Sequence, residues 1–378
     1  MHINIIPRWD FENDAGERLH EHLLPLLYQI NKQGKLTAAA KDCSLSYRHA
    51  WNILEKSEAF FGKSLVIKEK GRGAQLTQLG QKLLWSNQRI DARLHPEMES
   101  FATELNVELQ SLLSNHAPVV RIYASHGYAV ALMTQYVRDY QVEIHYHAPQ
   151  HALIALNEGR CRIAGFHQPI GLEVDVQRRR YQELLDPKRF GIIRFIRRQQ
   201  GLMYKEEKKK IGILSKLQQQ DQNTDHEPVA DIPARTTEFN SIQDLKQGNY
   251  RFINRQQGSG TRELFEQLLN NEGISPKDIP GIENQELTHS AVAAYIASGM
   301  ADVGFGVEAA AKRFGLAFTP IIEEYYLWAY PLEAEQDEDI QAFIATLSNP
   351  EYQAQINQLP GYQCEQSGTT SSTDWLFG

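Results

Sequence analysis

The sequence contains few cysteines, no long apolar run and none of the short motifs that identify common enzyme classes. Its cysteines, Cys43, Cys161 and Cys364, lie too far apart for a disulfide framework or a zinc-binding pattern. No segment approaches the ~20 apolar residues that a membrane-spanning helix requires. P-loop, HExxH, GxSxG and GxGxxG motifs are all absent. We therefore expect a protein that is not an enzyme and that has no metal ion, cofactor or membrane span.

The first residues of the sequence also lack the basic start and apolar core of a secretory signal. Together with three isolated thiols, this predicts a cytoplasmic protein. The length of 378 residues predicts two or three domains, because a single hydrophobic core does not grow to that size.

Charge is distributed unevenly along the chain. Residues 32–90 contain 11 Lys and Arg against 4 Asp and Glu, a net charge of +7, whereas the whole chain carries −8. The remainder therefore carries −15. A basic segment in an acidic protein is typical of a nucleic-acid-binding module, although a solvated basic face has the same composition.

The N-terminal part of the sequence predicts three helices in a helix-turn-helix arrangement. Apolar residues at three- and four-residue spacings predict a helix over 17–33, which Gly34 ends. A short alanine-rich helix follows in LTAAAKD, with Thr37 as its N-cap. After the tight turn CSLS, a third helix begins at Ser46. Two helices joined by a short turn, the second with a polar start, are typical of DNA-binding domains.

A basic hairpin after the third helix completes a winged helix-turn-helix. In SLVIKEKGRGAQLT, two short strands flank a tip that carries Arg72 between two glycines. The start of the third helix would contact base edges, and the hairpin would contact phosphates. The alternative is a surface helix that packs Trp51 inward. The candidate DNA-binding residues are Thr37, Ser46, Tyr47, Arg48, Trp51, Lys68, Lys70 and Arg72.

Residues 77–116 predict a long helix that links the DNA-binding domain to the rest of the chain. Apolar residues recur in a helical pattern from Leu79 to Leu112, and Pro96 should kink or divide the helix. An apolar seam of this kind is typical of dimerisation helices, so we expect a homodimer or a dimer of dimers.

From Pro118 the pattern changes to strands that alternate with helices, which predicts parallel α/β structure. One α/β block covers residues 118–167, and a second covers 250–318. Residues 205–238, between them, are rich in Gln and charged residues and predict a surface insertion.

Three strand-to-helix turns in this region offer hydroxyl groups and free backbone N–H groups. They are Ser125-His126-Gly127, the segment RQQGSGTR at 255–262, and Thr288-His289-Ser290. Such groups bind anions at helix N-termini, and ligands of open α/β sheets bind at the carboxyl ends of strands. Each Ser or Thr is otherwise a plain N-cap. The candidate ligand-binding residues are Ser125, His126, Arg255, Ser259, Gly260, Thr261, Arg262, Thr288 and His289.

These motifs resemble those of a known family. Residues 23–85 contain TAAAK, LSYRHAW, the Gly-Arg-Gly hairpin and LTQLGQKLL, and they resemble the DNA-binding domain of molybdate-responsive (ModE-type) regulators, which is LysR-like. Family members usually have Gly in place of Cys43. Residues from about 118 to 360 resemble the periplasmic-binding-protein-like domain found beside molybdenum-linked proteins, through ASHGYAVALM, AGFHQP, INRQQGSGTRELFEQLL and EYYLWAYP. The GSGTR string is also similar to one in tungstate-binding proteins.

The resemblance implies a small oxyanion, molybdate or tungstate, as the effector and a double-stranded DNA operator as the partner. The molybdenum or tungsten would enter only as the oxyanion. By this resemblance, the main contacts to the oxyanion are Ser125, Arg255, Ser259, Thr261, Arg262 and Thr288. His126 and His289 are the next candidates.

The predicted fold is α/β with three parts: a winged helix-turn-helix at 1–76, a linker and dimerisation helix at 77–116, and a two-lobed periplasmic-binding-protein-like sensor at 117–378. Lobe I would cover about 117–195 and 325–378, and lobe II about 196–324. Effector binding would close the lobes and reorient two DNA-binding domains, which would control molybdenum- or tungsten-related genes.

Two alternatives stay open. The first is a regulator that senses a small organic anion or a molybdenum-cofactor-related metabolite, since hydroxyl and N–H donors do not select the atom that bears the oxygens. The second is an oxyanion storage or delivery protein that uses the helix-turn-helix only for protein contacts.

Overall fold

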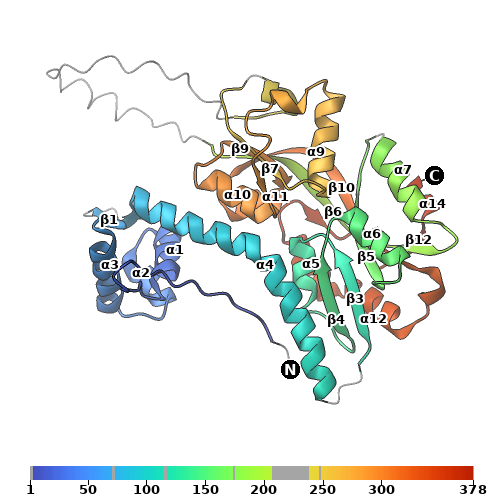
Figure 1. Cartoon of the computed structure of the whole chain (residues 1–378), viewed down its shortest axis with the longest axis horizontal. Coiled ribbons are helices and arrows are strands. Elements are labelled where there is room, and N and C mark those ends of the chain that lie inside the picture. The colour runs from blue at the N-terminus through green and yellow to red at the C-terminus, as the bar shows by residue number, and fades with distance from the viewer. Residues whose placement is uncertain are drawn as a thin grey trace.

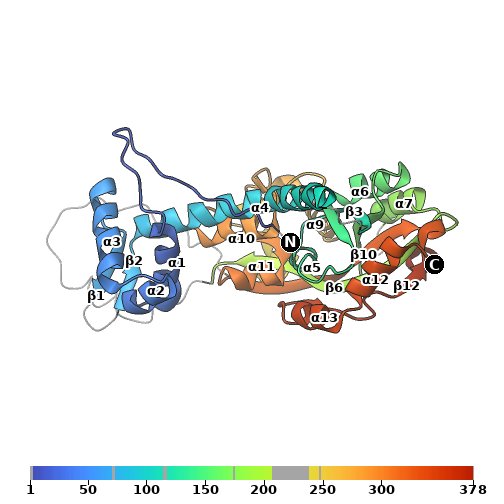
Figure 2. The ribbon, with the colours of Figure 1, turned by 90° about the horizontal axis from the view of Figure 1, so that it is seen from below.

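The computed structural model describes residues 3–69, 73–113, 117–172, 175–206, 238–246 and 248–377. Figure 1 shows a small N-terminal helical domain at one end of a long helix, and a larger α/β domain along the rest of that helix. In Figure 2 the same helix again connects the two domains. A helical N-terminal part, a long helix and an α/β part thus follow one another along the chain.

The N-terminal domain has three helices followed by an antiparallel hairpin. Ser46 begins the third helix by accepting a hydrogen bond from the backbone N of His49, as a helix N-cap does. Thr37 is not an N-cap: the second helix begins one residue earlier, and Lys35 occupies the cap position without a side-chain hydrogen bond. The elements are α1 (Leu23–Gln33), α2 (Leu36–Asp42), α3 (Tyr47–Phe61), β1 (Val66–Glu69) and β2 (Gly73–Leu76).

The linker is one continuous helix, α4 (Gln78–Leu112). Pro96 lies inside it and does not divide it, contrary to one of the two outcomes expected from the sequence. Leu79, Leu83 and Leu84 pack into the core of the N-terminal domain, so these residues are not part of an open dimer seam. The helical spacing of these leucines is explained by packing within the N-terminal domain.

Helix α4 packs against both halves of the α/β domain. Near its middle, the carbonyl oxygen of Ala92 accepts a hydrogen bond from Thr288, which begins helix α10 (His289–Ala297). Further along, the hydroxyl oxygen of Thr103 accepts a hydrogen bond from the backbone N of Ile144 in strand β4 (Gln141–Tyr146). The linker therefore contacts one element of each lobe.

The α/β domain contains one mixed sheet with the strand order β4-β3-β5-β10-β6-β9-β7-β8. Strands are parallel within each lobe, as predicted, and the two long strands in the middle are antiparallel to their neighbours. The first lobe contains β3 (Val119–Ala124), α5 (Tyr128–Met133), β4, α6 (Pro149–Asn157), β5 (Ile163–Pro169), α7 (Asp175–Leu184), η3 (Leu332–Ala334), α12 (Glu338–Leu347) and α13 (Pro350–Asn357).

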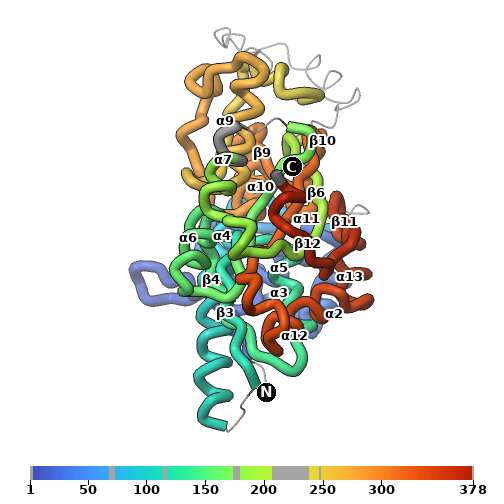
Figure 3. Tube along the Cα trace, turned by 90° about the vertical axis from the view of Figure 1, so that its right-hand side faces the viewer, coloured from blue at the N-terminus to red at the C-terminus, as the bar shows by residue number. Residues whose placement is uncertain are grey.

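The second lobe contains η1 (Ile242–Lys246), β7 (Phe252–Arg255), α9 (Gly260–Asn271), η2 (Pro276–Asp278), β8 (Gln285–Glu286), α10, β9 (Val303–Val307) and α11 (Glu308–Arg313). Figure 3 shows α9 of this lobe above α6 and α12 of the first lobe.

Two 15-residue strands, β6 (Phe190–Tyr204) and β10 (Ala317–Pro331), run through both lobes and pair with each other. Both strands include a boundary between the two predicted lobes, at 195/196 in β6 and at 324/325 in β10. Near the C-terminal end, β11 (Tyr362–Gln363) and β12 (Thr370–Ser372) pair with β6, and α14 (Asp374–Phe377) follows β12. The crossing strands bring residues far apart in the sequence to the junction of the lobes.

Candidate functional site

A cluster of buried charged side chains lies at the junction of the lobes. Arg198 on β6 and Glu324 on β10 are register partners, and the Nε of Arg198 lies 2.6 Å from a carboxylate oxygen of Glu324. Arg255, the last residue of β7, completes the cluster from the second lobe. The exposed fractions of Arg198, Glu324 and Arg255 are 2%, 1% and 8%. Charges this deeply buried are costly unless they are paired.

The charges in this cluster do not balance. Arg255 donates one hydrogen bond, 2.8 Å long, to the carbonyl oxygen of Leu287, and its Nε has no hydrogen-bond partner among the described residues. Burial, followed by the neighbouring Arg198, lowers the pKa of Arg255 to about 9, so the guanidinium stays charged at neutral pH. Two guanidinium groups thus share one carboxylate. A bound anion at this place would supply the missing negative charge.

Neutral polar groups surround the charged cluster. The amide nitrogen of Gln200 donates to the hydroxyl oxygen of Thr261 at 3.2 Å and to Glu324 at 2.8 Å. The same Thr261 oxygen lies 3.5 Å from Nε2 of His289. Nδ1 of His167 lies 3.4 Å from a guanidinium nitrogen of Arg198. The Gln200 amide is fully used by these contacts, and the hydroxyl of Thr261 and the imidazoles of His289 and His167 are the neutral polar groups that remain beside the charges.

The three predicted turns reach this cluster through their backbones. A Cβ added at Gly127, in the first turn, would lie 3.3 Å from Arg198. A Cβ added at Gly260, in the second turn, would lie 3.3 Å from the His167 ring. His289 brings the third turn, at the start of α10, to Thr261 at the start of α9. Two helix N-termini thus point their positive dipole ends to the same region.

Several predicted ligand contacts make other hydrogen bonds in this structure. The hydroxyl of Thr288 donates to Ala92 and accepts from the backbone N of Ala291, so it has no hydrogen left to donate to an anion. Ser259 caps α9 through the backbone N of Arg262. These two hydroxyl groups act as N-caps, the alternative left open in the sequence analysis.

Ser125 and Arg262 also differ from the sequence expectation. The Ser125 hydroxyl donates to the carbonyl oxygen of His147 at 3.3 Å. The Nε of Arg262 lies 2.7 Å from a carboxylate oxygen of Glu266, four residues along α9. Of the two arginines in this turn, Arg255 is therefore the one that carries an unbalanced charge.

Sequence reasoning missed Arg198, Gln200 and Glu324. The signal was present, since charged and amide side chains interrupt the apolar strands FGIIRFIRRQQGLMY and AFTPIIEEYYLWAYP. Burial of every second residue in such a strand would have placed Arg198 and Gln200 on the same face. The pairing of the two strands could not be read from the sequence.

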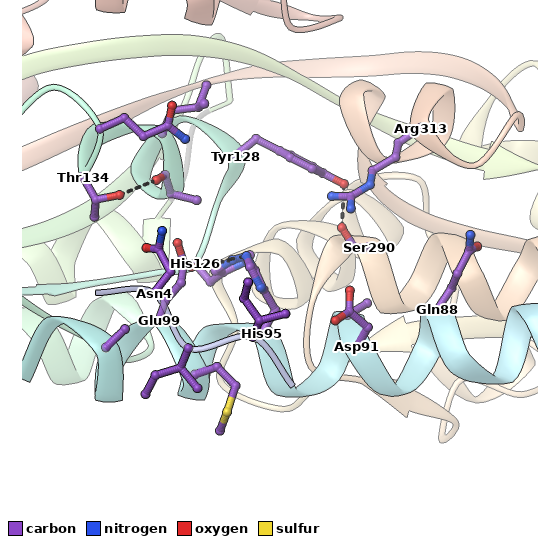
Figure 4. Close-up of a pocket in the computed structure, with 18 of the residues that line it drawn as sticks. Asn4, Gln88, Asp91, His95, Glu99, His126, Tyr128, Thr134, Ser290 and Arg313 are labelled. Atoms are coloured by element: carbon purple, nitrogen blue, oxygen red, sulfur yellow. Dashed lines mark hydrogen bonds and ion pairs between the residues drawn. The ribbon is translucent and has the colours of Figure 1, made fainter. Parts of the chain in front are cut away.

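A separate cavity of about 790 Å³ lies between α4 and the two lobes. Figure 4 shows His95 and Glu99 of α4 beside His126, with Tyr128, Ser290 and Arg313 further along the cavity. Its other lining residues include Asn4, Ile5 and Ile6 near the N-terminus, Tyr28 of α1, and Met98, Leu132, Phe314 and Leu359. His126, a predicted ligand contact, faces this cavity and lies 3.3 Å from Glu99.

The predicted DNA-binding residues differ in exposure. Thr37, Ser46, Tyr47 and Arg48 are exposed on α2 and at the start of α3. Trp51 is partly buried, packs against the N-terminal core and donates to Glu55 at 2.7 Å, which agrees with the alternative of an inward Trp51. Lys70 and Arg72, and the side chain of Lys68, lie outside the described residues, as does most of the 205–238 insertion.

Comparison with protein families places the fold. A family model described as the PBP superfamily domain matches residues 130–348, more than half of the chain. This chain belongs to the PBP superfamily, and the predicted α/β class with a binding-protein-like domain is confirmed. That family is one of binding proteins, in agreement with the expectation that the chain is not an enzyme.

Curated relatives match parts of the chain. It is 34% identical over 125 residues to "Uncharacterized protein YvgK" of Bacillus subtilis, covering 33% of this chain and 40% of that protein. It is 25% identical over 105 residues to "Molybdenum transport protein ModE" of Azotobacter vinelandii, covering 27% of this chain and 39% of that protein. It is also 29% identical over 103 residues to "Molybdenum-pterin-binding protein MopB" of Rhodobacter capsulatus, covering 26% and 38%. The chain thus spans about two fifths of the length of these relatives.

Solved structures match at low identity. A Corynebacterium glutamicum OxyR C206 mutant is 15% identical, with a TM-score of 0.38, and covers 88% of this chain and 92% of that one. A phosphate ABC transporter substrate-binding protein with bound phosphate from Clostridium perfringens is 13% identical, with a TM-score of 0.44, and covers 65% and 99%. Among the helices that the structure describes, none is long and apolar enough to cross a bilayer.

The buried histidines of the cluster predict acid sensitivity. Burial, followed by the nearby guanidinium groups, lowers the pKa values of His167 and His289 well below 6.5. The unfolded chain therefore binds more protons than the folded chain below about pH 6.5, and the folded state loses stability as the pH falls. We expect the melting temperature of the α/β domain to drop between about pH 7 and pH 5.

The double variant His167→Gln/His289→Gln should show a smaller drop in melting temperature over the same range, whereas His151→Ala, at an exposed position, should behave as the wild type. Thermal unfolding at several pH values, followed by circular dichroism, measures this. If the melting temperature of the wild type and that of the double variant change equally with pH, His167 and His289 are not the cause of the acid sensitivity.

Proposed function

We propose that this protein is a transcription regulator that binds operator DNA through its N-terminal domain and senses an oxyanion, molybdate or tungstate, in its PBP-like domain. The observation that carries the proposal is the buried cluster of Arg198, Arg255 and Glu324, which holds one positive charge more than it can balance. An oxyanion with its charge spread over several oxygens matches two guanidinium groups and the surrounding hydroxyl and imidazole donors.

The curated relatives support the choice of oxyanion. Two of them are named for molybdenum transport and for binding of molybdenum pterin. The resemblance of TAAAK, LSYRHAW and LTQLGQKLL to ModE-type regulators favours DNA as the second partner, and the basic charge of residues 32–90 agrees with it. The regulator would act in the cytoplasm, where its operator lies.

The linker helix gives a route from effector to DNA. Because α4 contacts α10 of one lobe and β4 of the other, a change in the angle between the lobes must alter at least one of these contacts. The N-terminal domain is attached to the same helix, so its orientation would change as well. The effector acts in this way only if it binds one lobe arrangement more tightly than the other.

Oxyanion binding is tested first. Isothermal titration calorimetry with molybdate, tungstate, sulfate and phosphate should show that molybdate or tungstate binds to the wild type more tightly than sulfate does. Arg255→Met should weaken binding about tenfold to a hundredfold, because a charge-assisted hydrogen bond is worth roughly 1.5–3 kcal/mol. The same variant should keep or raise the free energy of unfolding without ligand, since it removes a buried charge that no carboxylate balances and so removes its desolvation cost.

Arg262→Met is the matched control, because Arg262 pairs with Glu266 and should leave anion affinity unchanged. If none of the four anions binds, or if both variants bind as the wild type does, the oxyanion proposal is wrong.

A second candidate is a regulator of a small organic anion or a molybdenum-cofactor-related metabolite. The cavity of about 790 Å³ favours it, because this volume is typical of sites for organic ligands and Tyr28, Tyr128 and Phe314 line it. Binding of aromatic or pterin-like acids in the same calorimetric panel, unaffected by Arg255→Met, would favour this candidate.

DNA binding is tested at the start of α3. Arg48→Ala should weaken binding to a fragment selected by the wild type from random DNA by roughly 1–3 kcal/mol and relax its sequence preference. Arg72→Ala should weaken binding to all sequences alike and lower the salt slope by about one. Lys312→Ala removes an exposed positive charge from the α/β domain and should have no effect. Fluorescence anisotropy at several salt concentrations provides the readout. Wild-type affinity and preference in Arg48→Ala would refute the recognition-helix assignment.

Dimerisation through the outer face of α4 is part of the proposal. Leu94, Phe101, Leu105 and Leu112 recur at spacings typical of a helix–helix seam, and Phe101 and Leu112 are 53% and 79% exposed. A two-fold dimer would fit operator half-sites about 34–36 Å apart.

Light scattering at micromolar concentration should give a dimer for the wild type and a monomer for Phe101→Glu. Ile67→Glu, at a site that is 52% exposed in the N-terminal hairpin, is the matched control and should stay dimeric. A monomeric wild type, or a dimeric Phe101→Glu variant, would exclude this interface.

A further inference from the structure

The cavity beneath α4 contains a cluster of metal-binding side chains outside the charged cluster described above. His95 and Glu99 lie one turn apart on α4, and His126 comes from the turn between β3 and α5. One nitrogen or oxygen atom of each of the three side chains lies within 4.8 Å of the corresponding atoms of the others. Figure 4 shows the three side chains next to one another at one end of the cavity.

The distances suit a small transition-metal ion. Nε2 of His126 lies 3.3 Å from Oε2 of Glu99, and Nε2 of His95 lies 3.8 Å from the same oxygen. A tetrahedral ion with bonds of about 2.0–2.1 Å holds its ligand atoms roughly 3.3 Å apart. One edge of the site thus has this length already, and His95, at the exposed side of the cavity, can close the other by rotating its side chain.

The surroundings of the three ligands also fit a metal. The side chains of His126 and Glu99 are 18% and 19% exposed, and the 3.3 Å contact of Nε2 of His126 with Glu99 does not have the geometry of a hydrogen bond. The hydroxyl of Tyr146 donates to Oε2 of Glu99 at 3.1 Å, as outer partners of metal-bound carboxylates do. The cavity leaves room for water molecules as the remaining ligands.

We propose that His95, Glu99 and His126 form a binding site for a divalent transition-metal ion of the Zn²⁺ type. Two imidazoles and one carboxylate are a known zinc ligand set, and imidazole ligands disfavour Mg²⁺. The ion ties the linker helix to the first lobe, at the residue next to Ser125 in a turn that reaches the charged cluster. It differs from the oxyanion in place, charge and ligands, and the proposal does not depend on which effector the protein senses.

Sequence patterns did not predict this site, because its ligands follow neither a cysteine pattern nor HExxH. The expectation that the protein has no metal site rested on those patterns alone. His95 and Glu99 share a helix face at a spacing of four, but the third ligand comes from another domain.

The test uses the full chain after treatment with a chelator. Calorimetric titration with ZnCl₂ should give one site per chain. Co²⁺ should give the absorption bands of a tetrahedral or five-coordinate complex. MgCl₂ at about 1 mM should give no binding, because Mg²⁺ prefers oxygen ligands in octahedral geometry. Zn²⁺ should also raise the melting temperature of the wild type.

His126→Ala and Glu99→Gln should each weaken Zn²⁺ binding by at least about a hundredfold, since loss of even an outer partner costs roughly 10–100-fold. Glu99→Gln preserves the size of the side chain, and thermal unfolding without metal checks that each variant folds. His151→Ala should bind as the wild type does. His20, whose ring contacts those of His22 and His49 in the N-terminal domain, offers another possible site for Zn²⁺. The proposal would be overturned if the wild type does not bind Zn²⁺, if both ligand variants still bind it, or if His20→Ala loses it instead.

Discussion

The arrangement of two guanidinium groups around one carboxylate at the lobe junction is the constraint on which the rest of the α/β domain depends. Arg198 and Glu324 form an ion pair across the two crossing strands, while Arg255 brings a second positive charge from the other lobe. In a medium of low polarity an unpaired charge destabilises the folded state, so dipoles of the protein must compensate part of this cost. The carbonyl oxygen of Leu287 supplies one such dipole.

The neighbours of this cluster are consistent with that constraint. Burial, and after it the positive charge of the same arginines, lowers the pKa values of His167 and His289 well below 6.5. The helix N-termini of α9 and α10 add positive potential in the same place. The anion that we propose as the effector would balance this positive charge.

The linker helix α4 connects the two lobes to the N-terminal domain. Its contacts with Thr288 and Ile144 join it to the two lobes separately, and its first turns are part of the N-terminal core. Thr288, predicted as an anion contact, instead connects the helix that begins at the cluster with α4. A residue adjacent to the proposed anion site therefore also contacts the helix that carries the N-terminal domain, for which we propose DNA binding.

The sequence alone predicted the helices and the hairpin of the N-terminal part, the long helix, and the alternation of strands and helices in 118–167 and 250–318. Helical and alternating apolar periodicities, the Ser46 cap and the glycine-rich turns act over a few residues, and such local signals are legible in one chain. They also identified the turn that contains Arg255.

Only the tertiary structure decided what those residues contact. The partner of Arg198 is 126 residues away on a strand whose register depends on the whole sheet, and Arg255 is buried at the cluster because the two lobes meet there. The approach of His126 to His95 and Glu99 likewise follows from the packing of α4 on the first lobe. Long-range pairing is set by the fit of entire surfaces, and for that reason no short stretch of sequence specifies it.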